Sequence, residues 1–390
     1  MEIRVTKQAE KKLRRGYPLL QKEDLVREVK PTKQWVSFVN EAGRFLAKGY
    51  LGEQNKGIGW VLSNKDEPIQ LAFFAKLFTT AKKARERYFL DETTTAFRIF
   101  NGEGDGLGGL IIDLYESYAV FSWYNQTLFQ NKEEIVAAFK QVFPEVVGAY
   151  EKIRFSDGKL PESQWLYGKE APEPLLVKEN NITYATYLNE GLMTGIFLDQ
   201  KEVREALSMG LVAGKSLLNM FSYTGAFSVA AKMGGASQTT SVDLAKRSLP
   251  KTREQFEVNG LGLEENKIVV MDVFEYFKYA ARKDLHFDVI VLDPPSFARN
   301  KKKVFSVAKN YGDLVEDSVD ILSAEGLLVA STNAANVSRE KFQKMIEESL
   351  KNKQVRFKKV NEYQLPADFK TIPEFEEGNY LKVFFYKITK

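Results

Sequence analysis

The 390-residue sequence contains no cysteine and one histidine, His286. Without cysteine, disulfides, thiolate zinc sites and cysteine nucleophiles are excluded. His286 lies in DLHFD just before an expected strand, and no serine or acid around it suggests a triad. We interpret it as a structural or surface residue. Any general base must then be a carboxylate, a lysine, a tyrosine or the substrate itself.

Long hydrophobic runs are also missing. No apolar stretch approaches the roughly 20 residues that a membrane-spanning helix needs, and the opening MEIRVTKQAEKK has no signal-peptide core. We therefore expect a cytoplasmic protein with neither a membrane nor a metal among its partners. The net charge of +4 permits an anionic partner without requiring one.

What the sequence does contain is a series of strands that end in polar or acidic residues. Residues 215–225, KSLLNMFSYTG, predict a buried parallel strand that stops at a tight turn before a helix. Three further strands end at Asp243, Asp272 and Asp293. Ligands of open α/β sheets lie beyond such strand ends, where Asp243 can accept both hydroxyls of a ribose. The G-x-G-x-x-G pattern of dinucleotide folds is absent, which favours S-adenosylmethionine (SAM) over NAD and FAD.

The preceding half of the chain is expected to be rich in β-strands. A basic helix-like run opens it, and a hairpin follows around residues 40–43. The stretch GEGDGLGG lacks the Lys-Ser pair of a phosphate loop and opens onto a strand, so we interpret it as a structural turn. Residues 156–175, rich in Gly, Pro and charge, predict a surface excursion or a domain boundary.

After Asp293 come Pro294 and Pro295, whose fixed φ and missing N–H predict a stiff rim that faces the substrate. The following Arg299, Lys301 and Lys302 bring positive charge to this rim. A fifth strand, GLLVASTN, ends in three polar residues, and the last two strands suit an antiparallel sheet edge.

Motifs spread nearly end to end carry a resemblance to a known family. They are LRRGYP, EGDGLGGLIIDLY, NEGLMTGIFLDQ, LNMFSYTGAFSVAA, VDLAKRSL, DVFEYF, DVIVLDPPSFARNK and EGNYLK. In this order they make the sequence similar to the PUA-domain-containing class I methyltransferases of large-subunit ribosomal RNA. The resemblance implies an α/β protein with three domains: a PUA-like RNA-binding barrel at residues 1–72, a middle α+β domain at 73–185, and a Rossmann-like methyltransferase domain at 186–390. The sheet of the last domain is expected to be mostly parallel with an antiparallel edge hairpin.

The resemblance also implies roles for individual residues. SAM would be held by Phe197, Gln200, Asn219, Phe221, Ser222, Tyr223, Thr224, Gly225, Asp243, Leu244, Asp272, Val273 and Asp293. The expected catalytic groups beside the target base are Asp293, Pro294, Pro295, Thr332 and Asn333. Ribosomal RNA is the expected partner, and the expected RNA-binding residues are Lys11, Arg14, Arg15, Arg299, Lys301 and Lys302. A homodimer is left open.

One departure from the family bears on the reaction. The cytosine-5 branch has a nucleophilic cysteine in an F-S-C-S pattern at the end of its fifth strand, where this sequence reads Ala330-Ser331-Thr332-Asn333. An alcohol is a poor substitute for the thiolate that attacks carbon 6 of the ring. We therefore expect methylation of a ribosomal RNA base at N7 of guanine, or at another position such as an exocyclic amine, rather than 5-methylcytosine. The alternatives are 5-methylcytosine by a non-cysteine route and a non-catalytic RNA-binding assembly factor.

Overall fold

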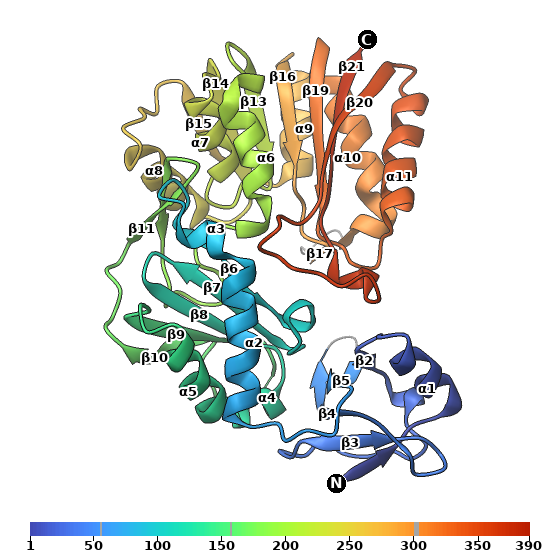
Figure 1. Cartoon of the computed structure of the whole chain (residues 1–390). Helices are drawn as coiled ribbons and strands as arrows, with labels where there is room; N and C mark the ends of the chain where they lie inside the picture. Colours follow the sequence, from blue (N-terminus) through green and yellow to red (C-terminus); the bar gives the residue numbers. More distant parts are fainter. Residues whose placement is uncertain (55–56, 157, 300–303) are drawn as a thin grey trace. The chain divides into compact units, whose positions relative to one another are not determined.

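The computed structural model describes residues 1–54, 57–156, 158–299 and 304–390. Contacts divide the chain into two compact units (Figure 1). The N-terminal unit comprises Met1–Val177, Thr186–Thr194 and Ala367–Gly378, and the C-terminal unit comprises Lys178–Ala185, Gly195–Pro366 and Asn379–Lys390. Two short segments that follow Val177 in the chain, Thr186–Thr194 and Ala367–Gly378, thus belong to the N-terminal unit. The three-domain division at residues 72 and 185 stays a prediction.

The N-terminal unit begins with a five-stranded sheet in the order β1-β3-β4-β5-β2. Its strands are β1 (Glu2–Arg4), β2 (Leu19–Leu20), β3 (Val36–Val39), β4 (Phe45–Gln54) and β5 (Gly57–Ser63). Strands β3 and β4 are antiparallel, which confirms the expected hairpin. The basic run forms helix α1 (Lys7–Arg14), which begins where the Thr6 side chain accepts the Ala9 N–H. Ala9 and Leu13 bury the apolar side of α1 in the core beside this sheet.

A second five-stranded sheet follows, in the order β10-β9-β8-β7-β6. Its strands are β6 (Ala96–Asn101), β7 (Leu110–Tyr115), β8 (Tyr118–Trp123), β9 (Gly148–Ile153) and β10 (Ser163–Gly168); the helices are α2 (Leu71–Ala84), α3 (Glu86–Phe89), α4 (Gln126–Gln130) and α5 (Lys132–Val142). Phe78 of α2 contacts Phe100 and Phe139 edge to face, so α2 and α5 cover one face of the sheet. Residues 156–175, expected to be a surface excursion or a domain boundary, contain the strand β10, which pairs with β9. No side chain of β10 is fully buried. A strand of this kind needs no alternation of apolar residues, so this stretch carries no strand signal in the sequence.

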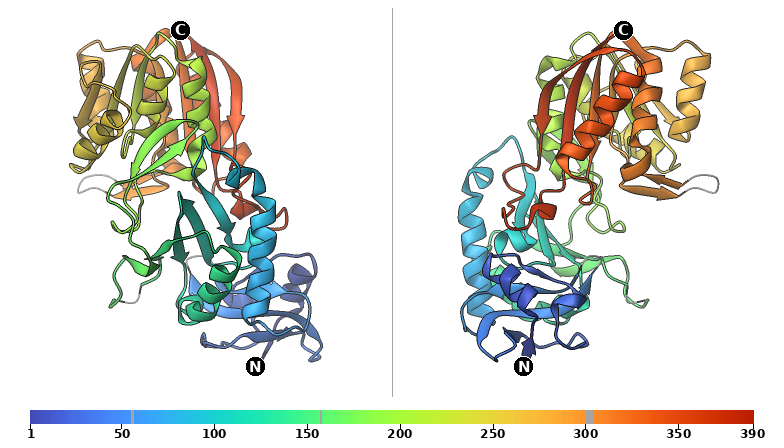
Figure 2. Two further views of the ribbon diagram at one scale, coloured as in Figure 1. Left: turned by 60° about the vertical axis from the view of Figure 1, so that its left-hand side comes forward. Right: turned by 90° about the vertical axis from the view of Figure 1, so that its right-hand side faces the viewer.

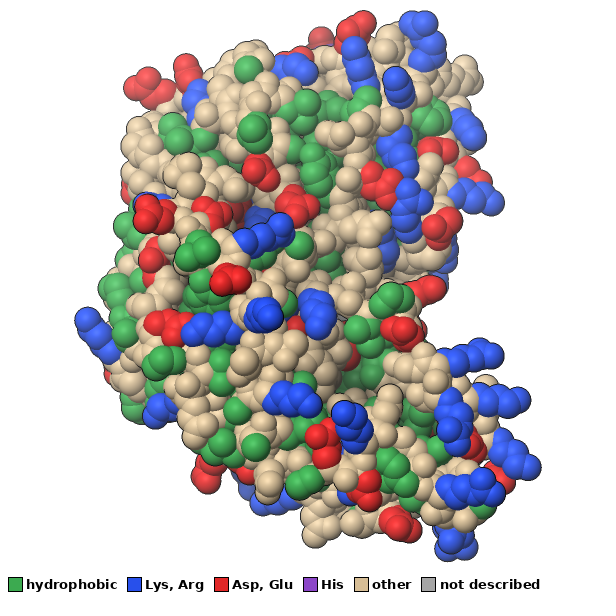
Figure 3. Space-filling view, in the orientation of Figure 1, with side chains coloured by type: hydrophobic (Ala, Val, Ile, Leu, Met, Phe, Trp, Pro, Cys, Tyr) green, Lys and Arg blue, Asp and Glu red, His purple; other side chains and the backbone are tan. Residues whose placement is uncertain are grey.

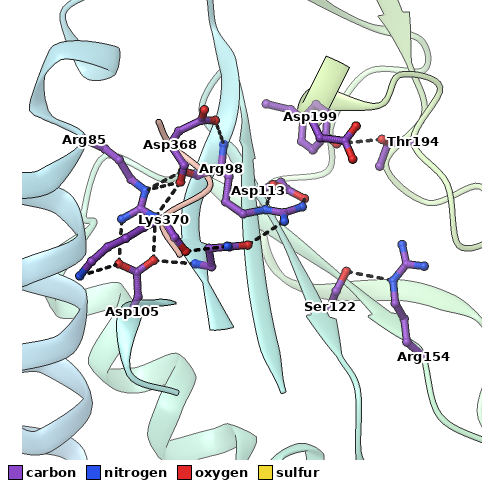
Figure 4. A network of polar contacts seen from close by, with 12 residues as sticks. Arg85, Arg98, Asp105, Asp113, Ser122, Arg154, Thr194, Asp199, Asp368 and Lys370 are labelled. Carbon is purple, nitrogen blue, oxygen red and sulfur yellow. Dashed lines mark hydrogen bonds and ion pairs between the residues drawn. The ribbon is translucent and has the colours of Figure 1, made fainter. Parts of the chain in front are cut away.

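The glycine-rich stretch forms the 3₁₀ turn η2 (Gly102–Asp105) between β6 and β7, which confirms its structural interpretation. Two hydrogen bonds, of 3.0 and 2.6 Å, join the buried Arg85 guanidinium to the Asp105 carboxylate. Arg85 Nη2 also donates to the main-chain oxygen of Asp368 at 2.7 Å (Figure 4). Through these bonds the segment Ala367–Gly378 is fastened to the turn.

The C-terminal unit contains a seven-stranded sheet in the order β15-β14-β13-β16-β19-β21-β20. Its strands are β13 (Ser216–Met220), β14 (Gln238–Asp243), β15 (Asn266–Val270), β16 (Phe287–Leu292), β19 (Leu322–Thr332), β20 (Arg356–Tyr363) and β21 (Lys382–Thr389). The first five strands in this order are parallel, and β21 is antiparallel to β19 and β20, which confirms the predicted sheet. The chain order reverses direction at β13, so the crevice for a ligand is expected beyond the ends of β13, β14 and β16.

Helices cover both faces of this sheet (Figures 1 and 2). They are α6 (Lys201–Ala206), α7 (Ala226–Met233), α8 (Ser248–Glu257), α9 (Val273–Arg282), α10 (Val307–Ile321) and α11 (Arg339–Asn352). Side chains alternate along β13: Leu217 packs with Val203 and Phe227, whereas Leu218 packs with Phe277 and Leu314. A strand that is apolar on both faces is typical of a central parallel strand. Two small pairs complete the fold: β11 (Leu175–Glu179) with β12 (Ile182–Thr186), and β17 (Phe297–Arg299) with β18 (Val304–Ser306).

Candidate active site

The turn after β13 has a strained backbone. Phe221 and Tyr223 have φ values of 59° and 51°, in the left-handed region that costs a residue with a side chain about 1–3 kcal/mol. Gly225, with φ of 76°, precedes α7, and a Cβ at this position would lie 2.5 Å from Thr252 Cγ2. Such conformations cluster at ligand sites. The turn at residues 221–225 is therefore a candidate ligand loop, and neither Phe nor Tyr signals this backbone in the sequence.

Asn219 lies beneath this turn in a buried polar chain. Its Nδ2 donates to Ser228 Oγ at 3.1 Å, and Ser228 Oγ lies 2.7 Å from Ser241 Oγ. The Asn219 Oδ1 atom is buried and has no hydrogen-bond partner among the described residues. A buried acceptor without a donor is costly, so this atom points to a ligand that would supply one.

Asp243 holds the turn from the end of β14. Its Oδ2 accepts the Tyr223 N–H at 2.9 Å, and its Oδ1 accepts the Ala245 N–H at 2.8 Å. Each carboxylate oxygen can accept further bonds, because it has more than one lone pair. The next residue, Leu244, is 56% exposed. Asp243, which can accept further hydrogen bonds, and the exposed apolar side chain of Leu244 are thus adjacent at this edge of the sheet.

The segment before α6 lies against the same turn. The rings of Phe197 and Tyr223 are 5.3 Å apart between centroids, and Thr224 Oγ1 donates to the main-chain oxygen of Gly195 at 2.7 Å. The Arg204 guanidinium fixes the Phe197 carbonyl at 2.7 Å. The structure therefore brings together the residues that were predicted from two distant motifs.

Asp272 and Val273 lie beyond the end of β15, at the start of α9. Asp272 is the N-cap of α9, where its Oδ1 accepts the N–H groups of Phe274 and Glu275 at 3.0 and 3.3 Å. Val273 is buried in the core. The sequence carried a signal for this cap, because an N-cap acid followed three residues later by Glu275 resembles a capping box. Their roles as SAM contacts stay predictions.

Asp293 directly follows β16 and lies in a polar cluster with Gln200 and Ser331. Gln200 Nε2 donates to Asp293 Oδ1 at 3.2 Å and to Ser331 Oγ at 2.8 Å. Burial raises the pKa of Asp293 to about 6, and the charge of Asp199 adds to this rise. The hydrogen bonds from Ser331 and Gln200 and the charge of Arg204 act on the pKa in the opposite direction. Asp293 therefore changes protonation close to neutral pH.

Tyr311 of α10 supports this cluster and was not singled out in the sequence. Its hydroxyl lies 3.3 Å from the main-chain oxygen of Leu292 and 3.0 Å from that of Ser331. Burial raises its pKa well above the usual value, so it stays a donor. A tyrosine on the apolar side of a helix usually has a polar partner, which was the available signal. Tyr311 joins the ends of β16 and β19.

The end of β19 carries Thr332, at the position where the cytosine-5 branch is expected to have its cysteine. Thr332 is fully buried, and its Oγ1 accepts the Ala334 N–H at 3.1 Å, within the turn after the strand. The preceding Ser331 is the hydroxyl that reaches Gln200. The Thr332 hydroxyl is thus engaged in a turn, and its expected catalytic role stays a prediction.

The rim after Asp293 is partly open to solvent. Pro294 is buried and Pro295 is exposed, and Phe297 is 61% exposed at the start of β17. Ser296 Oγ donates to Asn333 Oδ1 at 2.6 Å, which ties the rim to the end of β19. The short β17–β18 hairpin that follows was not predicted.

Three of the six residues predicted to bind RNA lie on α1 or at its end. Lys11 and Arg14 of α1 and its C-cap Arg15 are exposed, and Lys and Arg side chains gather over this part of the chain (Figure 3). Arg14 is paired with Glu10 at 2.8 Å, whereas Lys11 and Arg15 form no ion pair among the described residues. Outside the described part lie the Arg299 side chain and the whole of Lys301 and Lys302.

Comparison with known proteins identifies the family. Residues 153–386 match the S-adenosylmethionine-dependent methyltransferases, and residues 3–64 match a PUA-like domain. The chain belongs to the S-adenosylmethionine-dependent methyltransferase family. SAM is therefore its cofactor, and the predicted Rossmann-like fold with an N-terminal PUA-like domain is confirmed.

Relatives of this methyltransferase match it over nearly its whole length. YwbD of Bacillus subtilis, provisionally named as a ribosomal RNA large subunit methyltransferase, is 49% identical over 95% of this chain and 96% of its own. Ribosomal RNA large subunit methyltransferase I of Photobacterium profundum is 30% identical over 98% of both chains. The crystal structure of SMU.776, complexed with SAH, has a TM-score of 0.94 and 49% identity and covers 99% of this chain and 100% of that one.

Features of the site itself, apart from the relatives, also fit a bound SAM molecule. Asn219 Oδ1 and Gln200 Oε1 are buried acceptors without partners among the described residues, and the intervening turn is strained. Across the described ranges, no helix is long and apolar enough to cross a membrane. In the same ranges, no three His, Asp or Glu side chains group in a way that could hold a metal ion.

Proposed function

We propose that this methyltransferase transfers a methyl group from SAM to a base of large-subunit ribosomal RNA. The names of the relatives at 49% and 30% identity support this substrate. The PUA-like domain and the exposed cations of α1 support an RNA partner, because Lys and Arg side chains bind the phosphate backbone. An enzyme of ribosomal RNA fits the cytoplasmic location expected from the sequence.

Three groups of residues would hold SAM in this proposal. Asn219 would receive a hydrogen bond at its free Oδ1, Asp243 would accept the ribose hydroxyls, and the turn at residues 221–225 would enclose the amino acid part. Phe197 and Leu244 offer exposed apolar surface at the same edge. SAM supplies an electrophilic methyl group, so the protein has to orient the acceptor atom and exclude water.

The choice of the base atom that accepts the methyl group rests on the residue at the end of β19. A buried threonine that caps a turn stands there, and the sequence contains no cysteine. Carbon 5 of cytosine needs a nucleophile at carbon 6 before it can react, whereas N7 of guanine has its own lone pair. Orientation alone can then be sufficient. We therefore favour N7 of guanine, with an exocyclic amine as the other acceptor that needs no thiolate.

Asp293 has a positioning role in this scheme. Its carboxylate is fixed by Gln200 and Ser331, and it can accept a hydrogen bond from a ring or exocyclic N–H of the base. Guanine offers such donors, and a base that is extruded from its stack exposes them. Tyr311 would keep the two strand ends that border the base at a fixed separation.

Mass spectrometry of nucleosides from ribosomal RNA tests this proposal. RNA from a strain that lacks the protein should have lost one methylated nucleoside, and the purified protein with labelled SAM should restore it. Loss of 7-methylguanosine supports the favoured acceptor, and loss of 5-methylcytidine overturns it. Intact SAM binding without any transfer to RNA would instead support an assembly factor without catalytic activity.

A further inference from the structure

The face of the middle sheet that turns away from α2 and α5 carries a pair of cations. Lys152 and Arg154 are two residues apart along β9 and its extension, so their side chains lie on one face. Phe121 and Trp123 of the neighbouring β8 belong to the apolar core on the other face, together with α2 and α5. Lys152 and Arg154 therefore stand outside that core.

Lys152 is a buried lysine with neutral partners. Its Nζ donates to Ser163 Oγ at 2.9 Å and to the main-chain oxygen of Gly191 at 2.6 Å, and the residue is 1% exposed. Burial lowers its pKa to about 8, and the nearby charge of Arg154 adds to this shift. The carboxylates around it, Glu190, Glu162 and Glu173, oppose the lowering of the pKa without overcoming it.

Arg154 is held in the same way. Its Nη2 donates to the main-chain oxygen of Leu192 at 2.8 Å, and its Nε makes a long contact of 3.5 Å with Ser122 Oγ. The guanidinium carbon lies 5.8 Å from the ring centroid of Tyr124. A guanidinium has five N–H donors, so the Nη1 hydrogens have no protein partner among the described residues.

The acids nearest in sequence and register do not neutralise this pair. Glu151 points to the opposite face, where its oxygens accept Trp123 Nε1 and pair with Lys132. Asp113 of β7 is engaged by Arg98 through contacts of 2.8 and 3.1 Å. Figure 4 shows Arg98 with its acid, whereas the side chain drawn joined to Arg154 is Ser122. Within the described residues, neither Lys152 nor Arg154 forms an ion pair.

Lys152 and Arg154 form no ion pair among the described residues and repel each other, and Arg154 Nη1 keeps unused N–H donors. An anion with several acceptor oxygens would relieve the repulsion and take up these donors. We propose that Lys152 and Arg154 form a binding site for a backbone phosphate of the substrate RNA. The choice of RNA as the source of the phosphate rests on the proposed function.

The location of the pair suits this role. Gly191 and Leu192, whose carbonyls the two cations hold, belong to the segment Thr186–Thr194. The same chain continues without interruption into Gly195, which the ligand turn binds, and Gln200, which binds Asp293. A phosphate on Lys152 and Arg154 therefore contacts the residues that anchor the stretch of chain leading to the reaction site.

Salt-dependent RNA binding tests the inference. The probe is a fluorescein-labelled, mixed-sequence single-stranded RNA of about 20 nucleotides, and the readout is anisotropy across a KCl series. For the K152M/R154M variant we expect affinity to fall roughly tenfold at about 0.1 M salt and the log–log salt slope to fall by about 0.7, the value for one lost phosphate contact on a single strand. Lys83→Met is the matched control: it removes one exposed, unpaired cation from α2, on the other face of the sheet.

The outcomes separate the sources of the anion. An unchanged salt slope in K152M/R154M, with SAM affinity and Tm equal to those of the wild type, overturns the inference. A second result would also overturn it: millimolar orthophosphate raises the Tm of the wild type but not of K152M/R154M, while both proteins bind RNA equally. The site would then take free phosphate. If the slope falls but no ribosomal RNA is ever methylated, the phosphate site stands and the proposed function fails. Arg154→Lys, which keeps the charge, should keep the slope.

Discussion

Gln200 Nε2 donates to Asp293 Oδ1 at 3.2 Å, and the same nitrogen reaches Ser331 Oγ at 2.8 Å. One amide thus connects the segment before α6 with the ends of β16 and β19. A hydrogen bond to a carboxylate favours its charged form, so Gln200 lowers the pKa of Asp293 while burial raises it more strongly. The protonation of Asp293 is a balance between these two effects.

The first prediction concerns the pH dependence of methyl transfer. The pKa of Asp293 is raised to about 6, so the carboxylate that the proposed mechanism needs is lost as pH falls through about 6. The rate of transfer should therefore fall on the acidic side of its pH profile, and we call this fall the acidic limb. Gln200→Leu removes a hydrogen bond to the charged form of Asp293 and should shift the acidic limb to higher pH. Asp199→Asn removes a negative charge that raises the pKa of Asp293 and should shift the limb to lower pH. Single-turnover rates at saturating SAM measure both shifts.

The opposite signs make this pair of variants informative. A general loss of folding or of SAM binding would lower the rate at every pH without moving the limb. Shifts of equal direction in the two variants, or a limb that stays in place in both, would contradict the assignment of the limb to Asp293.

The second prediction is that Asp293→Asn stabilises the protein above about pH 6 while it lowers methyl transfer. A carboxyl whose folded pKa lies above its unfolded value destabilises the native state once it is ionised. The gain should therefore be absent below about pH 4 and complete above about pH 6. Because the carboxyl has partial access to solvent, we expect Asp293→Asn to raise the free energy of unfolding by roughly 1–2 kcal/mol. Thermal unfolding at the two ends of this range gives the difference, and SAM affinity should change little.

A Tm gain that is equal at both ends of the range would show that packing, rather than charge, is responsible. Full transfer activity in Asp293→Asn would remove the carboxylate from the proposed mechanism.

The strand-end acids could be predicted because parallel strands deliver their carboxyl ends to one edge of a sheet. Asp243 and Asp293 follow from hydrophobic runs that stop at an acid. The link between Gln200 and Ser331 could not be predicted in the same way, because it depends on which side of β19 each residue faces. Register along a strand decides that Ser331, rather than Thr332, reaches Gln200.

Backbone conformation and long-range packing account for the other gaps. The left-handed φ values of Phe221 and Tyr223 have no signature, since such residues rarely adopt them. The association of Ala367–Gly378 with the N-terminal unit depends on Arg85, whose partners include a carbonyl 283 positions away in the sequence. Local patterns carry no information about such contacts.

The third prediction is that Asp243 both binds SAM and stabilises the turn after β13. Asp243→Ala removes the acceptors of the Tyr223 and Ala245 N–H groups and the group proposed for the ribose. We expect SAM affinity to fall by about 1.5–3 kcal/mol, roughly ten- to a hundredfold. Asp272→Ala is a comparison for stability alone, because Asp272 is itself an expected SAM contact: loss of its N-cap should cost about 1 kcal/mol of stability. Calorimetry of SAM binding and urea unfolding separate the two effects, and unchanged SAM affinity in Asp243→Ala would contradict its role.

The last prediction tests whether the alcohol at the end of β19 acts as a nucleophile. The Thr332 hydroxyl accepts the Ala334 N–H in a buried turn, so Thr332→Ala should cost roughly 1 kcal/mol of stability but leave most of the transfer rate. Ser331→Ala removes a hydrogen bond that favours the charged form of Asp293 and should move the acidic limb of the rate to higher pH. Single-turnover transfer and a denaturing gel for a covalent protein–RNA complex measure these effects. Abolished transfer in a folded, SAM-binding Thr332→Ala variant, together with a complex in the wild type, would establish a covalent route and a pyrimidine target.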